Sequence, residues 1–92
     1  MGSNEQALVE YEKAVSLFPE NARARFAYGK LLQRSGQLEL AKKELEQART
    51  LDPKLSDALY ALSRLYTALG ETTLASQTAQ EFLASKQKQS EH

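Results

Sequence analysis

Apolar residues recur along much of this chain at spacings of three and four, which is the pattern of one buried face of an α-helix. Tyr28, Leu31 and Leu32 follow this pattern, and it returns over residues 62–69. Strong helix formers fill most of the positions between them. The pattern predicts helices over residues 4–17, 21–35, 38–51, 55–69 and 72–87. The turns between them are short, so consecutive helices should pack as antiparallel neighbours.

The chain also repeats itself with a period of 34 residues. Pro19 and Pro53 are 34 positions apart, and so are Gly36 and Gly70. At the same offset, small residues fall on small ones and apolar residues on apolar ones, as in Ala7 with Ala41 and Ala75, Ala14 with Ala48, Leu17 with Leu51, and Phe26 with Tyr60. Each period therefore holds two helices.

The turn residues predict where these helices begin and end. Gly36 and Gly70 lie where the first helix of a period must stop, a place where glycine tolerates positive φ. The two prolines lie just beyond the second helix. Asn21 and Ser56 are predicted to be the N-caps of the helices that follow them.

The period, the two helices in each period and the pattern of small and large positions resemble the tetratricopeptide repeat. In a repeat that begins at Ala22, the eight signature positions are Arg25, Tyr28, Gly29, Leu32, Ala41, Leu45, Ala48 and Pro53, of which Arg25 alone departs from the pattern. The resemblance implies an all-α fold, a right-handed α-solenoid of antiparallel helical hairpins with five helices. It also implies a protein-protein interaction scaffold rather than an enzyme.

On this basis the chain divides into about two and a half repeats. We interpret residues 1–3 as a cloning remnant, 4–20 as the second helix of a partial repeat, 21–54 and 55–87 as complete repeats, and 88–92 as a tail. The second complete repeat departs from the pattern near its end, where Ala79 and Phe82 exchange the expected large and small residues and Gln87 replaces proline. Its last helix is predicted to be a polar end cap.

Composition removes several functions from consideration. The chain has no cysteine, and its 12 basic and 12 acidic residues give a formal net charge of zero, so no overall field would attract nucleic acid or an anionic membrane. No apolar run approaches the length of a membrane span. We expect no nucleic acid or membrane partner and a soluble segment, cytoplasmic by default because nothing identifies a compartment.

Catalytic and metal chemistry receive little support from the residues present. His92 is the only histidine and lies at the end of the predicted tail. Glu44 with Glu46, and Glu10 with Glu12, are interpreted as solvated surface, because residues two apart lie on different sides of a helix. We therefore expect no catalytic residues, no metal site and no cofactor.

The resemblance implies a concave groove lined by the first helix of each hairpin. The groove positions that could bind a partner are Arg23, Phe26, Lys30, Arg34, Tyr60 and Arg64, with Ala27, Asp57, Ala61 and Thr67 beside them. Basic and aromatic groups at these spacings share a helix face and could bind a protein or peptide segment, an acidic one in particular. The alternative interpretation is an ordinary solvated helix surface. The Lys, Asn and Arg set with which some family members hold a terminal carboxylate is absent, because the corresponding positions hold Phe26, Lys30 and Ala61.

Two other functions remain open. Leu8, Tyr11 and Val15 lie on a helix that lacks the first helix of its own repeat, so this face could be uncovered and form a homo-oligomer. A piece of a longer repeat protein would produce the same open end. Binding of single-stranded RNA by a helical repeat is the third alternative, and the neutral charge argues against it.

Overall fold

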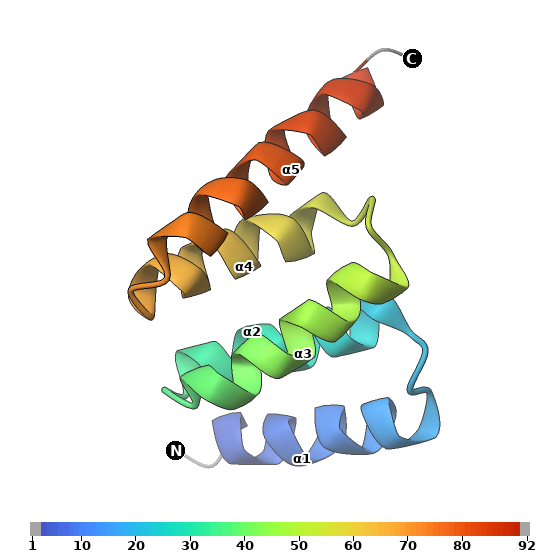
Figure 1. The fold of residues 1–92 in the computed structure, drawn as a ribbon. Helices are drawn as coiled ribbons and strands as arrows, with labels where there is room; N and C mark the ends of the chain where they lie inside the picture. Colours follow the sequence, from blue (N-terminus) through green and yellow to red (C-terminus); the bar gives the residue numbers. More distant parts are fainter. Residues whose placement is uncertain (1–2, 91–92) are drawn as a thin grey trace.

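The computed structural model describes residues 3–90 of the chain, and side chains are described for residues 4–87. Within these residues the fold is all-α and consists of α1 (Ser3–Leu17), α2 (Ala22–Arg34), α3 (Leu38–Leu51), α4 (Ser56–Ala68) and α5 (Thr72–Ser90). Helices α2 and α3 form one antiparallel hairpin, α4 and α5 form the next, and α1 packs against α2 (Figure 1). The predicted fold class, an all-α solenoid of helical hairpins, is confirmed.

The turn geometry follows the residues that specify it. Gly36 and Gly70 have φ values of 83° and 79°, the left-handed conformation expected after the first helix of each hairpin. The side chain of Asn21 accepts a hydrogen bond from the backbone N–H of Ala24 at 3.0 Å, as an N-cap should. Both glycines and Asn21 therefore act as the sequence predicts.

The N-cap prediction for Ser56 is wrong. Ser56 is the first residue of α4 and is buried, while Leu55 occupies the cap position without a side-chain hydrogen bond. Leu55 is buried in a cluster with Ala48 and Ala58. Its packing fixes the entry to α4, and its backbone carbonyl accepts the hydrogen bond from Leu59 at 3.3 Å. Tertiary burial thus overrides the local preference of serine for the cap.

The two chain ends differ from the predicted boundaries. Helix α5 continues to Ser90, three residues past the predicted end at residue 87, because neither glycine nor proline follows and Lys and Gln favour the helix. The predicted tail thus contributes residues 88–90 to α5, and residues 91–92 lie outside the described part. At the other end, Ser3 begins α1, and the first two residues of the expected cloning remnant are not described.

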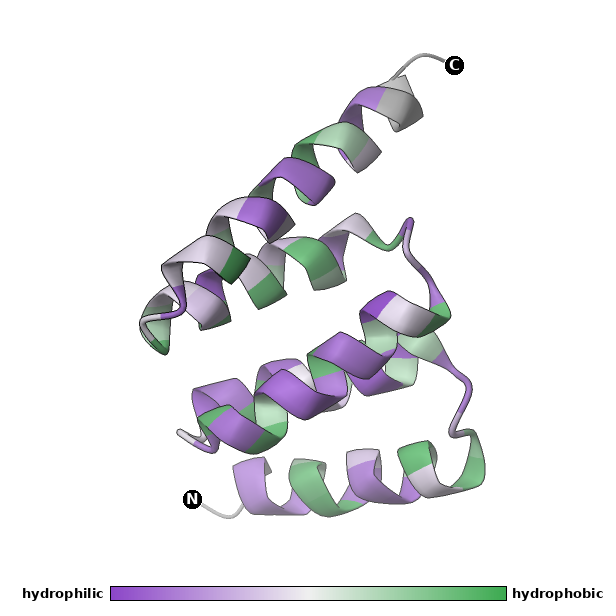
Figure 2. Cartoon of the chain, in the orientation of Figure 1, coloured by the Kyte–Doolittle hydropathy of each residue, from purple (hydrophilic) through white to green (hydrophobic). Residues whose placement is uncertain are grey.

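The core is built where small residues let helices approach. A Cβ atom at Gly29 would lie 2.8 Å from Cγ of Leu45, so α2 and α3 can be this close only because position 29 carries no side chain. Ala41, Leu45 and Ala48 on α3 are fully buried. Apolar residues occur in short runs on every helix and alternate with hydrophilic ones, as helices that bury one side require (Figure 2).

Two acidic side chains on α3 are engaged in the packing, which contradicts their interpretation as solvated surface. The Glu44 carboxylate, only 8% exposed, accepts a hydrogen bond from the Arg25 guanidinium at 2.9 Å, and Arg25 Nε donates to the Pro19 carbonyl, also at 2.9 Å. The Tyr66 hydroxyl donates to the Glu46 carboxylate at 2.5 Å. The Arg25 head group is thus held by two partners, and the Glu44 and Glu46 carboxylates each link α3 to a neighbouring helix.

Candidate binding groove

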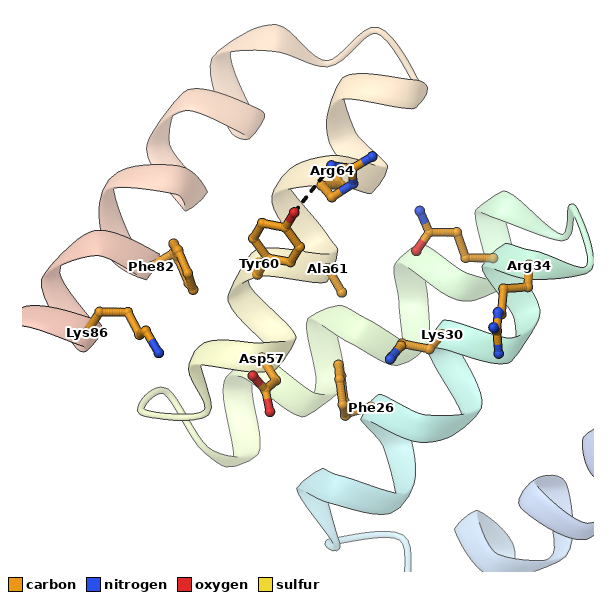
Figure 3. A pocket seen from close by; sticks show the side chains of 10 residues that line it. Phe26, Lys30, Arg34, Asp57, Tyr60, Ala61, Arg64, Phe82 and Lys86 are labelled. Atoms are coloured by element: carbon orange, nitrogen blue, oxygen red, sulfur yellow. Dashed lines mark hydrogen bonds between the residues drawn. The ribbon is translucent and has the colours of Figure 1, made fainter. Parts of the chain in front are cut away.

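A groove lies across the first helices of the two hairpins and is closed on one side by α5. Its volume is about 640 Å³, and α2, α4 and α5 supply its walls. The residues that line it are Phe26, Lys30, Gln33, Arg34, Asp57, Tyr60, Ala61, Arg64, Phe82 and Lys86 (Figure 3). It lies on the first helices of the hairpins, where the resemblance to the tetratricopeptide repeat implies a concave surface.

The structure brings together most of the predicted groove residues. Phe26, Lys30 and Arg34 line the groove from α2, and Tyr60 and Arg64 line it from α4. Arg23 does not: it lies in the first turn of α2, ahead of Phe26, and is exposed outside the groove lining. The positions Asp57 and Ala61, which follow from the repeat pattern, also line the groove.

Cations and rings are paired within each first helix. The Lys30 ammonium lies 5.3 Å from the centre of the Phe26 ring, and the Arg64 guanidinium lies 5.8 Å from the centre of the Tyr60 ring. Arg64 also donates a hydrogen bond to the Tyr60 hydroxyl at 3.3 Å (Figure 3). Both pairs are four residues apart, the spacing that places side chains side by side on a helix. Each cation is therefore held beside an apolar surface instead of extending freely into solvent.

Sequence reasoning missed the contribution of α5. The Phe82 ring lies 5.4 Å from the Tyr60 ring, tilted by 49°, and Lys86 follows one turn later. Phe82 stands 34 residues after Ala48, which is fully buried between helices. A phenyl ring does not fit that space, and α5 diverges from α4 toward its C-terminal end (Figure 1). The exchange of sizes at Ala79 and Phe82 was the signal that could have predicted an aromatic residue in the groove.

The groove has a local charge that the whole chain lacks. Lys30, Arg34, Arg64 and Lys86 contribute four positive charges, and Asp57 contributes one negative charge, a difference of plus three. Because the whole chain is formally neutral, the residues outside the groove lining together carry a net charge of minus three. A partly enclosed groove of one sign concentrates ligands of the opposite sign.

The predicted self-association face is wrong in two of its three residues. Val15 is 9% exposed and belongs to the core, and Leu8 packs against the same core from α1. Both are covered by α2, which is the next helix in the stack. Tyr11 is 38% exposed and lines a surface hollow with Gln6, Ala7 and Glu10. Ala7 and Tyr11 also line a second hollow, together with Phe26, Lys30 and Arg34 of α2.

The described part of the chain was also searched for metal sites and membrane-spanning helices. Among residues 3–90, no group of three or more His, Cys, Asp or Glu side chains could hold a metal ion. None of the helices described here has both the length and the hydropathy of a membrane span.

Comparisons with known proteins agree with this architecture. The tetratricopeptide repeat family profile matches residues 1–54 and again residues 35–92. Since these matches cover the whole chain, the chain belongs to the tetratricopeptide repeat family, whose fold supports protein-protein interaction scaffolds.

Solved structures show the same fold. Fifty-eight chains of solved structures match, among them one described as the crystal structure of MamA, with a TM-score of 0.91 and 18% sequence identity. The match covers 97% of this chain and 52% of that one, so this chain spans about half the length of MamA. At this identity the likeness concerns the fold alone. No curated protein gives a significant match.

Proposed function

We propose that the chain docks a segment of a partner protein in the groove, and that this segment is acidic and carries at least one large apolar side chain. The observation that carries the proposal is the convergence of three rings, Phe26, Tyr60 and Phe82, with four cations in one groove. The rings come from three different helices. A solvated surface has no need of this arrangement, because exposed aromatic groups lower solubility.

Rings and cations would contribute in different ways. Tyr60 is 48% exposed, so an apolar side chain laid on it and on Phe82 removes additional apolar surface from water. Carboxylates of the partner would accept hydrogen bonds from Lys30, Arg34 or Arg64 at the rim. Each exposed ion pair contributes only about 0–1 kcal/mol, so the rings supply affinity and the charges supply orientation and partner choice.

The proposal can be tested with immobilised arrays of short peptides. One array combines Asp or Glu with Phe, Leu or Tyr, and a matched array carries Lys or Arg at the acidic positions. We expect the labelled chain to bind the acidic array in preference to the basic one. A paired charge reversal, Lys30→Glu with Arg64→Glu, should remove this preference, and Tyr60→Ala should lower binding to every acidic peptide.

Matched controls separate the groove from the rest of the surface. Lys43→Glu changes the charge of an exposed lysine on α3 outside the groove, and Phe18→Ala removes a ring that is 62% exposed and does not line the groove. Arg23→Glu tests the predicted residue that lies outside the lining. Equal losses for Lys43→Glu and for the groove pair would show that net charge alone governs binding, and the groove would then not be the docking site.

A further inference from the structure

The turn between α1 and α2, residues 17–20, carries two of the most exposed large apolar side chains in the described part of the chain. Leu17 is 72% exposed and Phe18 is 62% exposed. This exposure belongs to the position in the repeat, because Leu51, one period after Leu17, is 37% exposed although α3 packs against both α2 and α4. We call residues 17–20 the α1–α2 turn.

The fold does not require a ring at position 18. The Phe18 N–H donates to the carbonyl four residues earlier at 2.8 Å, and the Phe18 carbonyl accepts a hydrogen bond from the N–H three residues later at 3.0 Å. Asp52, one period later, makes the same two hydrogen bonds at 2.9 Å and 3.1 Å. The turn thus forms in the same way around an aspartate. An exposed ring that the turn does not need indicates a role in binding.

We propose that the groove of one copy of this chain binds the α1–α2 turn of a second copy, whose Phe18 packs against Tyr60 and Phe82. The proposal rests on the docking function of the groove and identifies the segment that is docked. The turn supplies both features that the groove selects, since it combines large apolar side chains with the exposed Glu20 carboxylate.

The charges of the two surfaces are complementary. The groove lining carries plus three and the rest of the chain minus three, so a second copy offers the groove a surface of opposite sign. Glu20 would accept hydrogen bonds from the cations of the groove. Arg23 is the one cation of residues 17–23, and Asp57 is the one carboxylate of the groove lining. Each charged group of the segment therefore has a counterpart of opposite sign.

The α1–α2 turn is held in place before it binds. Arg25 Nε donates a hydrogen bond to the Pro19 carbonyl at 2.9 Å, in addition to the two backbone hydrogen bonds of Phe18. The ring of Pro19 also fixes its own φ. Docking a turn that is already ordered loses less conformational entropy than docking a flexible peptide.

The two surfaces are different parts of the same chain. None of residues 17–20 lines the groove, so one copy can donate its turn while its own groove holds the turn of another. Such a contact is head-to-tail, and its repetition produces a ring or an open chain of copies.

The test measures self-association by sedimentation velocity over a series of concentrations. We expect the original chain to associate reversibly as its concentration rises. Phe18→Asp copies the second turn into the first, so the variant should keep the circular dichroism of the original chain. It should nevertheless weaken association roughly tenfold or more, because the buried ring is lost. Lys30→Glu with Arg64→Glu should weaken association as well, whereas Lys43→Glu, outside the groove, should not.

A mixture of two variants tests the contact itself. The Phe18→Asp chain keeps a working groove, and the chain with Lys30→Glu and Arg64→Glu keeps a working turn. Each variant should sediment as a monomer, and their equimolar mixture should form a dimer of one copy of each and no larger species. A mixture that stays monomeric overturns the proposal. Association that persists undiminished in either variant alone also overturns it.

The acidic peptide array separates this proposal from the docking function on which it rests. If the original chain binds the array but remains a monomer up to roughly millimolar concentration, the groove docks another partner and the self-association proposal is wrong. If the chain neither binds the array nor associates, the docking function of the groove is wrong as well.

Discussion

Substitution of only one partner of the ion pair between Arg25 and Glu44 should lower the stability of the fold, whereas substitution of both should change it little. Its side chains are 17% and 8% exposed, so it lies between a surface pair and a buried one. One period later, the same two positions hold Leu59 and Thr78, each 1% exposed, so the fold already accommodates an uncharged pair there. The double variant Arg25→Leu with Glu44→Thr copies that arrangement into the first complete repeat.

The expected loss of stability depends on which charged side chain remains without its partner. Arg25→Leu leaves the Glu44 carboxylate buried without its cation and should cost about 2–3 kcal/mol, between the values for exposed and buried pairs. Glu44→Thr should cost about 1 kcal/mol, because Arg25 keeps its bond to the Pro19 carbonyl and part of its contact with water. The double variant should lie within about 1 kcal/mol of the original chain.

Urea unfolding followed by far-UV circular dichroism measures these differences directly. A chain of this size has roughly 5–14 kcal/mol of stability, so a loss of 2–3 is large. Lys42→Ala is the matched control, since its pair with Glu71 is 25% and 35% exposed and should contribute only about 0–1 kcal/mol. If the loss of stability in the double variant equals the sum of the two single losses, the reasoning is refuted. A gain in stability from Arg25→Leu alone would refute it as well.

Three further predictions concern the core. Ala41→Leu should lower stability by about 1–3 kcal/mol, because Ala41 is fully buried beside α2; an unchanged melting temperature would contradict the assigned register. Thr78→Val should raise stability by up to about 1 kcal/mol in urea unfolding, because the buried Thr78 hydroxyl has no hydrogen-bond partner among residues 4–87; a loss would show that the hydroxyl is satisfied. Burial, and then the Glu46 carboxylate, raise the pKa of Tyr66 above its ordinary value of 10.0. The unfolded chain therefore loses this proton first, so stability is fully present below about pH 10 and falls as pH rises further, by at most about 1.4 kcal/mol per pH unit. Tyr66→Phe should reduce that slope in unfolding measured across the alkaline range, and some slope should remain because burial also raises the pKa of Tyr28; an unaltered slope would rule out Tyr66 as its source.

The repeat could be predicted from the sequence because its determinants are local or periodic. Gly36 and Gly70 set their turns through backbone geometry, which neighbouring residues scarcely alter. Asn21 caps a helix three residues away. A period of 34 residues then places the small positions where helices cross, without any knowledge of the three-dimensional contacts.

What could not be predicted depends on contacts between distant residues. The Arg25 and Glu44 side chains are 19 positions apart, and those of Tyr66 and Glu46 are 20 apart. Helical spacing relates residues three or four positions apart, so it cannot predict either contact. Phe82 enters the groove because the space taken by Ala48 in the previous hairpin cannot hold a ring. Ser56 failed as a cap because the burial of Leu55 decides where α4 begins.

The covering of α1 by α2 on one side only has a consequence for the order in which the chain opens. Helix α3 contacts both α2 and α4, whereas α1 contacts α2. Amide hydrogens of α1 should therefore exchange with deuterium well before those of α3, and the opening should spread inward from the N-terminal end.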